Sequence, residues 1–317
     1  MHYDNNERKL NFMDRTTATN FTVLFMFLNL LFWTLVWEPV ANTLHMPTLF
    51  QLAFFQVLLF IIPCGLYLFF TKSSPKLVLR IHNISFKNII LIIFIAITIQ
   101  PAMTMLSFLS SFLFKNNVSA TLYANSDSNL FLLLISVAVV PAICEELFFR
   151  GIVFYNFHNL RLGKACFVTG LYFSFMHMDL QQILYTFAIG TFFCFLVYRT
   201  NSIYSSILAH FVINASQTIY SALMLKLEKQ GILYNIQTLL APKGELYSIM
   251  MLFLFSIPFF VGFLWLFCKN NIPQSIPTEE GFPEYHPNRK CKETPYDVFF
   301  YSVIGIYIAV TVIPLFK

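Results

Sequence analysis

Long apolar segments dominate this chain, and short polar gaps separate them. A helix needs roughly 20 mostly apolar residues to cross a bilayer. Nine runs approach that length: 21–37, 50–70, 89–114, 130–151, 164–178, 180–198, 203–224, 247–267 and 298–316. They lack the period-two alternation of membrane barrel strands. The pattern therefore predicts an all-α, polytopic transmembrane helical bundle with about eight to nine spans.

The composition excludes several other classes of protein. Hydrophobic residues make up 57% of the chain and charged residues 11%, against about 25% charged in soluble domains. A soluble protein of this size cannot bury so much apolar surface, so a disordered chain, a soluble Rossmann-type enzyme and a nucleic-acid-binding domain are excluded. We expect a lipid bilayer around the chain and no nucleic-acid partner. The six cysteines form no CxxC pair, and we interpret them as small apolar residues of the helices.

The distribution of Lys and Arg predicts the orientation. These residues prefer the cytoplasmic side of a membrane protein. If the N-terminus is inside and all nine runs cross, fifteen Lys and Arg lie in inside segments and five in outside segments. We therefore predict a multi-pass protein of the cell membrane with a cytoplasmic N-terminus.

The runs divide the chain into five regions. They are a cytoplasmic tail (1–20), three N-terminal transmembrane helices (21–114), a group of helices that carries ionisable residues (130–224), a loop with a transmembrane helix (225–267), and a linker with a C-terminal helix (268–317). An ionisable side chain inside a span costs a few kcal/mol and is typical of a functional site. The region 130–224 is therefore the predicted location of the functional site.

The fourth run contains two adjacent carboxylates and one guanidinium. Glu146 and Arg150 are four residues apart, so they share a helix face and can form an ion pair. Glu145 lies about 100° around the helix and has no partner at i+4, since that position is Phe149. An unpaired carboxylate in an apolar setting is suited to act as a general base. Taken alone, the two could also be interface carboxylates beside a positive-inside Arg.

Two further runs add histidines. His177 follows Phe173 by four residues, and His210 precedes Asn214 by four, so each pair shares a helix face. Each histidine alone is compatible with a structural role, such as a hydrogen bond between membrane helices. Together, a carboxylate pair, two histidines and an asparagine on three helices are the set that a hydrolase needs.

These motifs, in this order, resemble the CPBP family of intramembrane proteases, which includes the type II CAAX prenyl endopeptidases and the Abi or bacteriocin-processing proteins. The resemblance covers Glu145-Glu146-x-x-x-Arg150, Phe173-x-x-x-His177 and His210-x-x-x-Asn214. It implies that Glu145 activates the attacking water with help from His177, and that His210 and Asn214 stabilise the oxyanion. It also implies that the Glu146–Arg150 ion pair holds the site together, with Phe173 as a supporting residue.

Two chemistries fit these residues. In a glutamate mechanism, Glu145 polarises the water and no cofactor is needed. In a metal mechanism, His177, His210 and Glu145 bind zinc, the two-His-one-Glu set of open catalytic sites. The sequence contains no HExxH segment, the commonest zinc-protease motif, and we favour the glutamate mechanism. If span four ends at Gly151, Glu145 lies about 10 Å from its cytoplasmic end.

The sequence thus predicts an intramembrane endopeptidase that cleaves a membrane-associated protein or peptide. The alternative is a catalytically silent membrane scaffold or a bacteriocin self-immunity protein, since motifs alone do not guarantee turnover. A transporter would show inverted repeats, and none is visible. The sequence does not identify the substrate, its prenylation or the oligomeric state.

Overall fold

The computed structural model describes residues 15–114, 128–229, 244–272 and 294–316, and its regular elements are all helices. Residues 1–14 of the predicted tail, 230–243 of the loop and 273–293 of the linker lie outside the described residues. The first helix, α1, begins at Arg15, so the last six residues of the predicted tail 1–20 are helical.

The N-terminal part of the bundle contains three long apolar segments. Their elements are α1 (Arg15–Thr43), then α2 (Thr48–Gln56), η2 (Val57–Ile61) and α3 (Ile62–Thr71), a short α4 (Pro75–Val78), and α5 (Phe86–Thr98) with α6 (Gln100–Ser111). The second segment is continuous through η2, a π-helical turn.

The C-terminal part contains the remaining helices. They are α8 (Leu130–Leu134), η3 (Ile135–Val139), α9 (Val140–Glu146), η4 (Leu147–Val153) and α10 (Phe154–Asn156), then η5 (Phe157–Asn159), α11 (Leu162–Met176), α12 (Ile183–Thr200), α13 (Tyr204–Lys229), α15 (Gly244–Asn270), α16 (Val298–Tyr307), η7 (Ile308–Val312) and η8 (Ile313–Phe316). The elements from α8 to α10 form one continuous span with two π-helical segments, η3 and η4.

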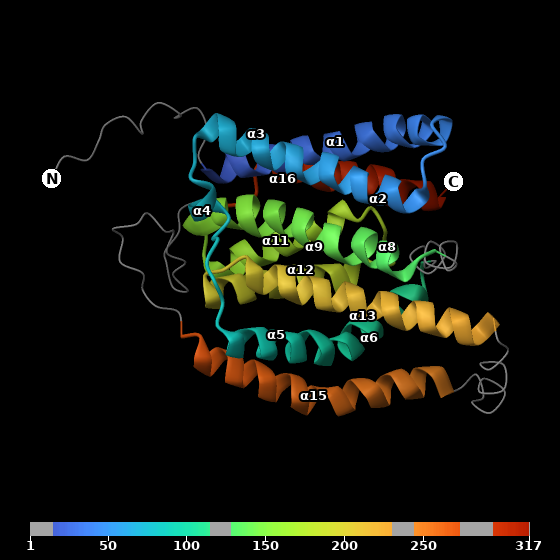
Figure 1. The fold of residues 1–317 in the computed structure, drawn as a ribbon. Helices are drawn as coiled ribbons and strands as arrows, with labels where there is room; N and C mark the ends of the chain where they lie inside the picture. The colour runs from blue at the N-terminus through green and yellow to red at the C-terminus, as the bar shows by residue number, and fades with distance from the viewer. Residues whose placement is uncertain (1–14, 115–127, 230–243, 273–293, 317) are drawn as a thin grey trace.

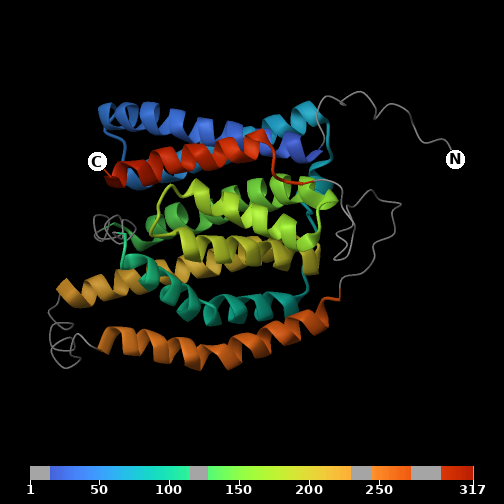
Figure 2. The same ribbon diagram turned by 180° about the vertical axis from the view of Figure 1, so that it is seen from behind.

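The helices lie side by side, and the described chain begins and ends at opposite ends of the bundle (Figures 1 and 2). At one edge, α1 packs against α16, and at the other α15 packs against α5. The elements that carry the motifs, α9 with η4, α11 and α13, lie between these edges together with α12, where α11 packs against α12 and α13 against α9. The bundle thus surrounds the polar residues with apolar helices.

In the described residues, eight helical segments are long and apolar enough to cross a membrane. This confirms the predicted all-α bundle. The fifth run, 164–178, corresponds to α11, which has 15 residues and is about 22 Å long, against about 30 Å of bilayer core. The chain turns after His177 and continues into α12 from Ile183. His177 therefore lies at the turn of the α11–α12 hairpin.

The fourth span is longer than the sequence predicts. It extends from Leu130 to Asn156, five residues beyond the expected end at Gly151. Glu145 is therefore about 16 Å from the Asn156 end, deeper than the expected 10 Å. Arg150, which the orientation count placed in an inside segment, is fully buried within this span. The inside count falls from fifteen to fourteen and still exceeds the outside count of five.

Two glycines set the contact between α11 and α12. A Cβ atom added to Gly170 would lie 2.3 Å from Thr191 Oγ1 and 2.7 Å from the Thr191 nitrogen. A Cβ atom at Gly190 would lie 3.0 Å from Gly170 Cα and 3.0 Å from Phe173. Small residues let membrane helices approach closely, so this pair brings the helix that carries His177 against its neighbour.

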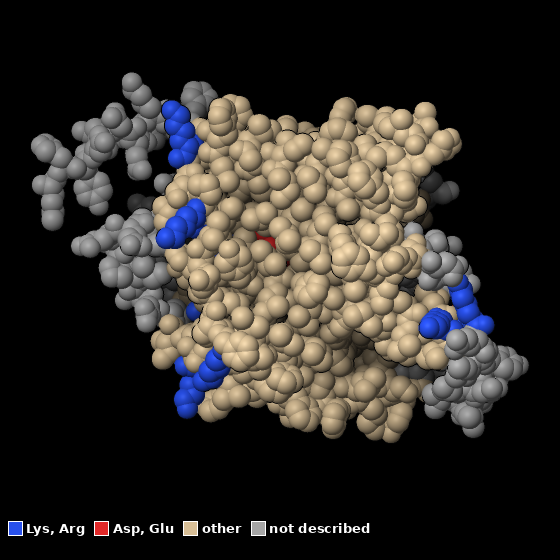
Figure 3. Space-filling view, in the orientation of Figure 1, with Lys and Arg blue, Asp and Glu red and all other residues tan. Residues whose placement is uncertain are grey.

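The visible basic side chains gather at the two ends of the bundle, and the middle of the face in Figure 3 carries none. The middle of that face shows no charged residues apart from a small patch of acidic atoms at the bottom of a hollow. The arrangement matches the expected distribution in a membrane protein, where charged groups lie at the ends of spans and buried charges belong to a functional site.

Candidate functional site

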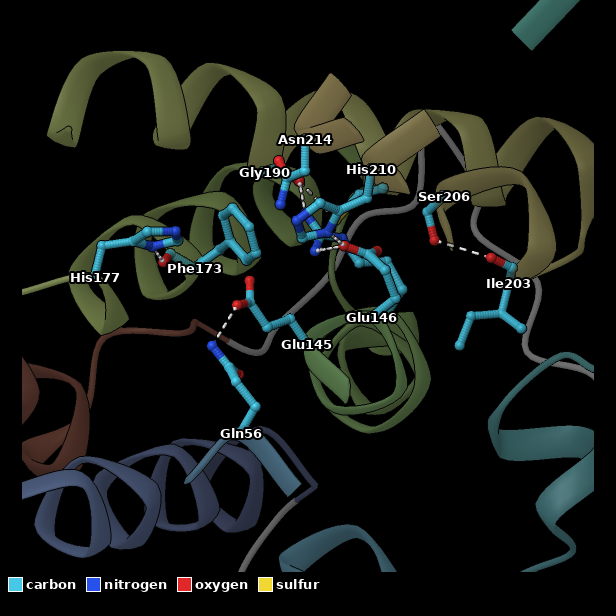
Figure 4. A network of polar contacts seen from close by, with 12 residues as sticks. Gln56, Glu145, Glu146, Phe173, His177, Gly190, Ile203, Ser206, His210 and Asn214 are labelled. Atoms are coloured by element: carbon cyan, nitrogen blue, oxygen red, sulfur yellow. Dashed lines mark hydrogen bonds and ion pairs between the residues drawn. The ribbon is translucent and has the colours of Figure 1, made fainter. Parts of the chain in front are cut away.

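Glu145 and Glu146 end α9, directly before the π-helical segment η4. The exposed fraction is 7% for Glu145 and 0% for Glu146. Because consecutive helical residues point about 100° apart, the two carboxylates face different neighbours. Figure 4 shows Glu146 next to His210, whereas Glu145 points toward Gln56 and Phe173.

Glu146 belongs to a buried polar network. Its Oε1 accepts a hydrogen bond from Arg150 Nη1 at 2.7 Å and lies 2.9 Å from His210 Nδ1. Arg150 Nη2 donates to the Gly190 carbonyl oxygen at 2.9 Å. The i+4 spacing anticipates the first contact, whereas the second and third join α9 and η4 to α13 and α12. The network therefore connects three spans through buried charge-assisted hydrogen bonds.

Aromatic rings enclose this network. The Arg150 guanidinium carbon lies 4.5 Å from the centroid of Phe173 and 5.2 Å from that of Phe193. The Phe173 ring also contacts the rings of His177, with centroids 5.0 Å apart, and His210, at 6.0 Å. A cation over an aromatic face is attracted by the ring quadrupole. Phe173 is thus the apolar residue shared by the groups on α11, α13 and η4.

Glu145 has a much simpler environment. Gln56 Nε2, at the end of α2, donates a hydrogen bond to Glu145 Oε1 at 3.2 Å. Within the described residues, no hydrogen bond joins Glu145 to His177, His210 or Asn214. The carboxylate that the sequence leaves without an i+4 partner therefore receives one neutral donor and has no ion pair in the described part of the chain.

His177 and Asn214 each contact backbone. His177 Nδ1 lies 2.9 Å from the Phe173 carbonyl oxygen, and since a carbonyl only accepts, Nδ1 is the donor. Nε2 of the neutral ring is then an acceptor. Asn214 Nδ2 donates to the Val137 carbonyl oxygen at 3.1 Å, which leaves its second N–H available. Both side chains are half-buried.

The described residues contain no group of three His, Cys, Asp or Glu side chains close enough to hold a metal ion. His177, His210 and Glu145, the alternative zinc ligands, are therefore not arranged as a zinc site. His210 Nδ1 faces Glu146 and His177 Nδ1 faces a carbonyl.

Sequence reasoning missed two parts of the site. Gln56 lies in a run without charges, and amides in such runs are common. Its only signal was a polar residue within an apolar segment. Gly190 is missed because the group it contributes is a backbone carbonyl, which every residue has. The available signal for Gly190 is that glycine has no Cβ atom, which permits close approach of helices.

The described helices form a multi-pass bundle with a buried polar centre, and the segment that carries the polar motifs matches a known family. The sequence model of the family described as type II CAAX prenyl endopeptidase Rce1-like matches residues 127–216. This confirms the resemblance to the CPBP family over the segment that carries the three motifs, and supports a CAAX-type membrane protease. No curated protein and no solved structure matches the chain.

Proposed function

We propose that this protein is an intramembrane endopeptidase with a glutamate mechanism. The observation that carries the proposal is the unequal treatment of two adjacent carboxylates. Glu146 is paired with Arg150 and with His210, whereas Glu145 accepts one hydrogen bond from a neutral amide. A carboxylate that is not committed to an ion pair is free to accept a proton. Glu145 is therefore the general base.

The reaction begins with a water molecule between Glu145 and the scissile carbonyl. Glu145 accepts a proton from the water as its oxygen attacks the carbonyl carbon, and a tetrahedral intermediate with an oxyanion forms. Nε2 of His177 accepts the water's second hydrogen bond and orients it. The carbon–nitrogen bond then breaks, and protonated Glu145 transfers its proton to the departing amine.

His210 and Asn214 supply the donors for the oxyanion. Nδ1 of His210 is held by Glu146, so Nε2 is directed away from the ion pair and donates when the ring is protonated at both nitrogens. Asn214 has an N–H beyond the one that bonds Val137. Preorganised donors in a dry site are worth several kcal/mol of barrier. The Glu146–Arg150 pair acts through His210 by fixing its position.

The substrate in this proposal is a membrane-associated protein or peptide. Glu145 lies about 16 Å from one end of its span, so a water-soluble folded protein does not reach it. With the N-terminus cytoplasmic, the Asn156 end of span four is also cytoplasmic, and the bond to be cleaved enters from that half of the bilayer.

The test compares cells that carry the wild-type chain with cells that carry Glu145→Gln, at matched expression. New protein N-termini are sequenced in the membrane fraction and the medium. The substitution keeps the shape of the side chain and removes the base, so the expected result is a set of cleavage products found only with wild type. Glu228→Gln is the matched control, because Glu228 is exposed at the far end of α13.

Two outcomes separate the alternatives. Products that persist with Glu145→Gln contradict the proposed base, and a phenotype without any product difference supports the membrane scaffold or immunity protein. A zinc chelator added to membranes that hold the wild-type chain gives the second comparison. Cleavage that continues supports the glutamate mechanism, and cleavage that stops and returns with added zinc supports the metal mechanism.

A further inference from the structure

Gln56 is the one residue outside the segment 127–216 that is hydrogen-bonded to Glu145 in the described part of the chain. It lies on α2, 89 positions before Glu145 in the sequence. We propose that Gln56 is a positioning residue of the active site. In this proposal, its amide nitrogen fixes the Glu145 carboxylate and its amide oxygen accepts a hydrogen bond from the attacking water. The inference rests on the proposed function.

The local backbone places the Gln56 amide next to the Glu145 carboxylate. Gln56 is the last residue of α2, and the π-helical η2 begins at Val57. The same change follows the two carboxylates, since α9 ends at Glu146 and the π-helical η4 begins at Leu147. Single π-helical turns often occur at functional sites, because the wider turn redirects the side chains that follow it. Two such turns lie next to each other on the helices that carry Gln56 and Glu145, because η2 packs against both α9 and η4.

The oxygen atom of the Gln56 amide, Oε1, also supports this proposal. Gln56 Oε1 is buried, and no described residue donates a hydrogen bond to it. Buried side-chain oxygens are rarely left without a donor in native proteins. A water that Glu145 activates carries two protons, and one of them is directed to the carboxylate. In this proposal, the other proton is directed to Gln56 Oε1 and His177 Nε2. Figure 4 shows Gln56 below the Glu145 carboxylate and His177 to its left.

Packing holds α2 in place independently of this hydrogen bond. The ring of Phe60, on η2, contacts the rings of Phe148 and Phe149 on η4, with centroids 5.9 and 6.0 Å away. All three rings are buried. A substitution that removes the Gln56 amide therefore leaves the helices packed through their aromatic contacts. This separates a positioning role of Gln56 from a role in folding.

The role of Gln56 is tested by cleavage kinetics with the purified full chain and a fluorogenic peptide that spans the cleavage site found in cells. The variants are Gln56→Leu, which removes donor and acceptor, and Gln56→Glu, which keeps the size but loses the donor. We expect each to lower kcat about tenfold or more while KM stays within about twofold, because water activation rather than binding is impaired. The control is Gln51→Leu, since Gln51 lies on the same helix and donates to the Met46 carbonyl oxygen instead.

The melting temperature of each variant is measured in the same detergent. A fall in kcat with a melting temperature close to that of Gln51→Leu supports the positioning role, and Gln56→Glu provides the same comparison if Gln56→Leu does not fold. An unchanged kcat, or a rise in KM alone, overturns it. If Gln56→Leu cleaves normally and Glu145→Gln does not, only this inference fails. If Glu145→Gln also cleaves normally, the proposed function fails as well.

Discussion

The surroundings of Glu145 and Glu146 differ although the two residues are adjacent on one helix. Glu146 is completely buried and shares one oxygen between a guanidinium and an imidazole. Glu145 keeps a small exposed fraction and accepts a single hydrogen bond from an amide. Chemically identical groups thus have different environments because of their neighbours, and such differences separate the roles of catalytic carboxylate pairs in other enzymes. In the proposed mechanism, Glu146 stabilises the bundle and Glu145 reacts.

The largest expected effect tests the structural half of this comparison. Glu146→Gln leaves Arg150 buried with a neutral partner, and breaking a buried pair by removing one charge costs about 3–5 kcal/mol. We expect a corresponding loss of folded protein in detergent, measured by thermal or denaturant unfolding. Cleavage is expected to fall with it, since His210 loses its charged partner.

The double variant Glu146→Gln with Arg150→Met is the control for this prediction. Removing both charges leaves no unpaired ion, so much of the lost stability returns, while activity stays low. If the single variant is as stable as wild type, the ion pair does not hold the helices together and the comparison fails on its structural side.

A smaller effect tests the helix contact that brings the Gly190 carbonyl to Arg150. Gly170→Ala places a methyl group against Thr191, including its backbone nitrogen, which a side-chain rotation cannot relieve. Overpacking of this kind costs about 1–3 kcal/mol, and unfolding measurements report it.

Gly163→Ala is the matched control on the same helix, because a Cβ atom there meets nothing within 4 Å. Alanine stabilises a helix relative to glycine, so this variant is expected to be as stable as wild type or slightly more. Equal effects of the two substitutions would show that the α11–α12 contact is not as close as described.

The smallest expected effect tests the other side of the comparison, the proposal that Glu145 is catalytic and not structural. Glu145→Gln changes the unfolding free energy by less than about 0.5 kcal/mol, because the new amide oxygen can still accept a hydrogen bond from Gln56 and no ion pair is lost. The same unfolding assay as for Glu146→Gln provides the measurement. A loss comparable to that of Glu146→Gln would mean that Glu145 is also a structural residue.

The sequence was sufficient to locate the helices along the chain, because a bilayer imposes a length and an apolar character that can be counted. The sequence was less accurate about the residues at which the spans end. The fourth span continues past Gly151 through Ile152, Val153 and Phe154, and Arg150 does not end it because its charge is paired within the bundle. A hydropathy count treats every Arg as a boundary and has no means to recognise a neutralised one.

The candidate site was predictable as a set of residues but not as a set of contacts. The i+4 rule gives contacts within one helix, such as Glu146 with Arg150. The contacts of His210 with Glu146 and of Gln56 with Glu145 join different helices, and the two residues of each contact are 64 and 89 positions apart in the sequence. Such contacts depend on how the spans pack and rotate, which a single sequence does not specify. Whether these groups catalyse cleavage stays a prediction.

The buried Arg150 has a consequence for how the protein is made. During synthesis, span four leaves the ribosome before α12 and α13 exist. Gly190 follows Arg150 by 40 residues, and His210 follows Glu146 by 64. A lone Arg in the centre of a helix costs about 2.5–3.5 kcal/mol at the translocon. Glu146 is one turn away and is already present, so the pair enters the bilayer together. The newly inserted helix then exposes its polar face to lipid until the later helices cover it.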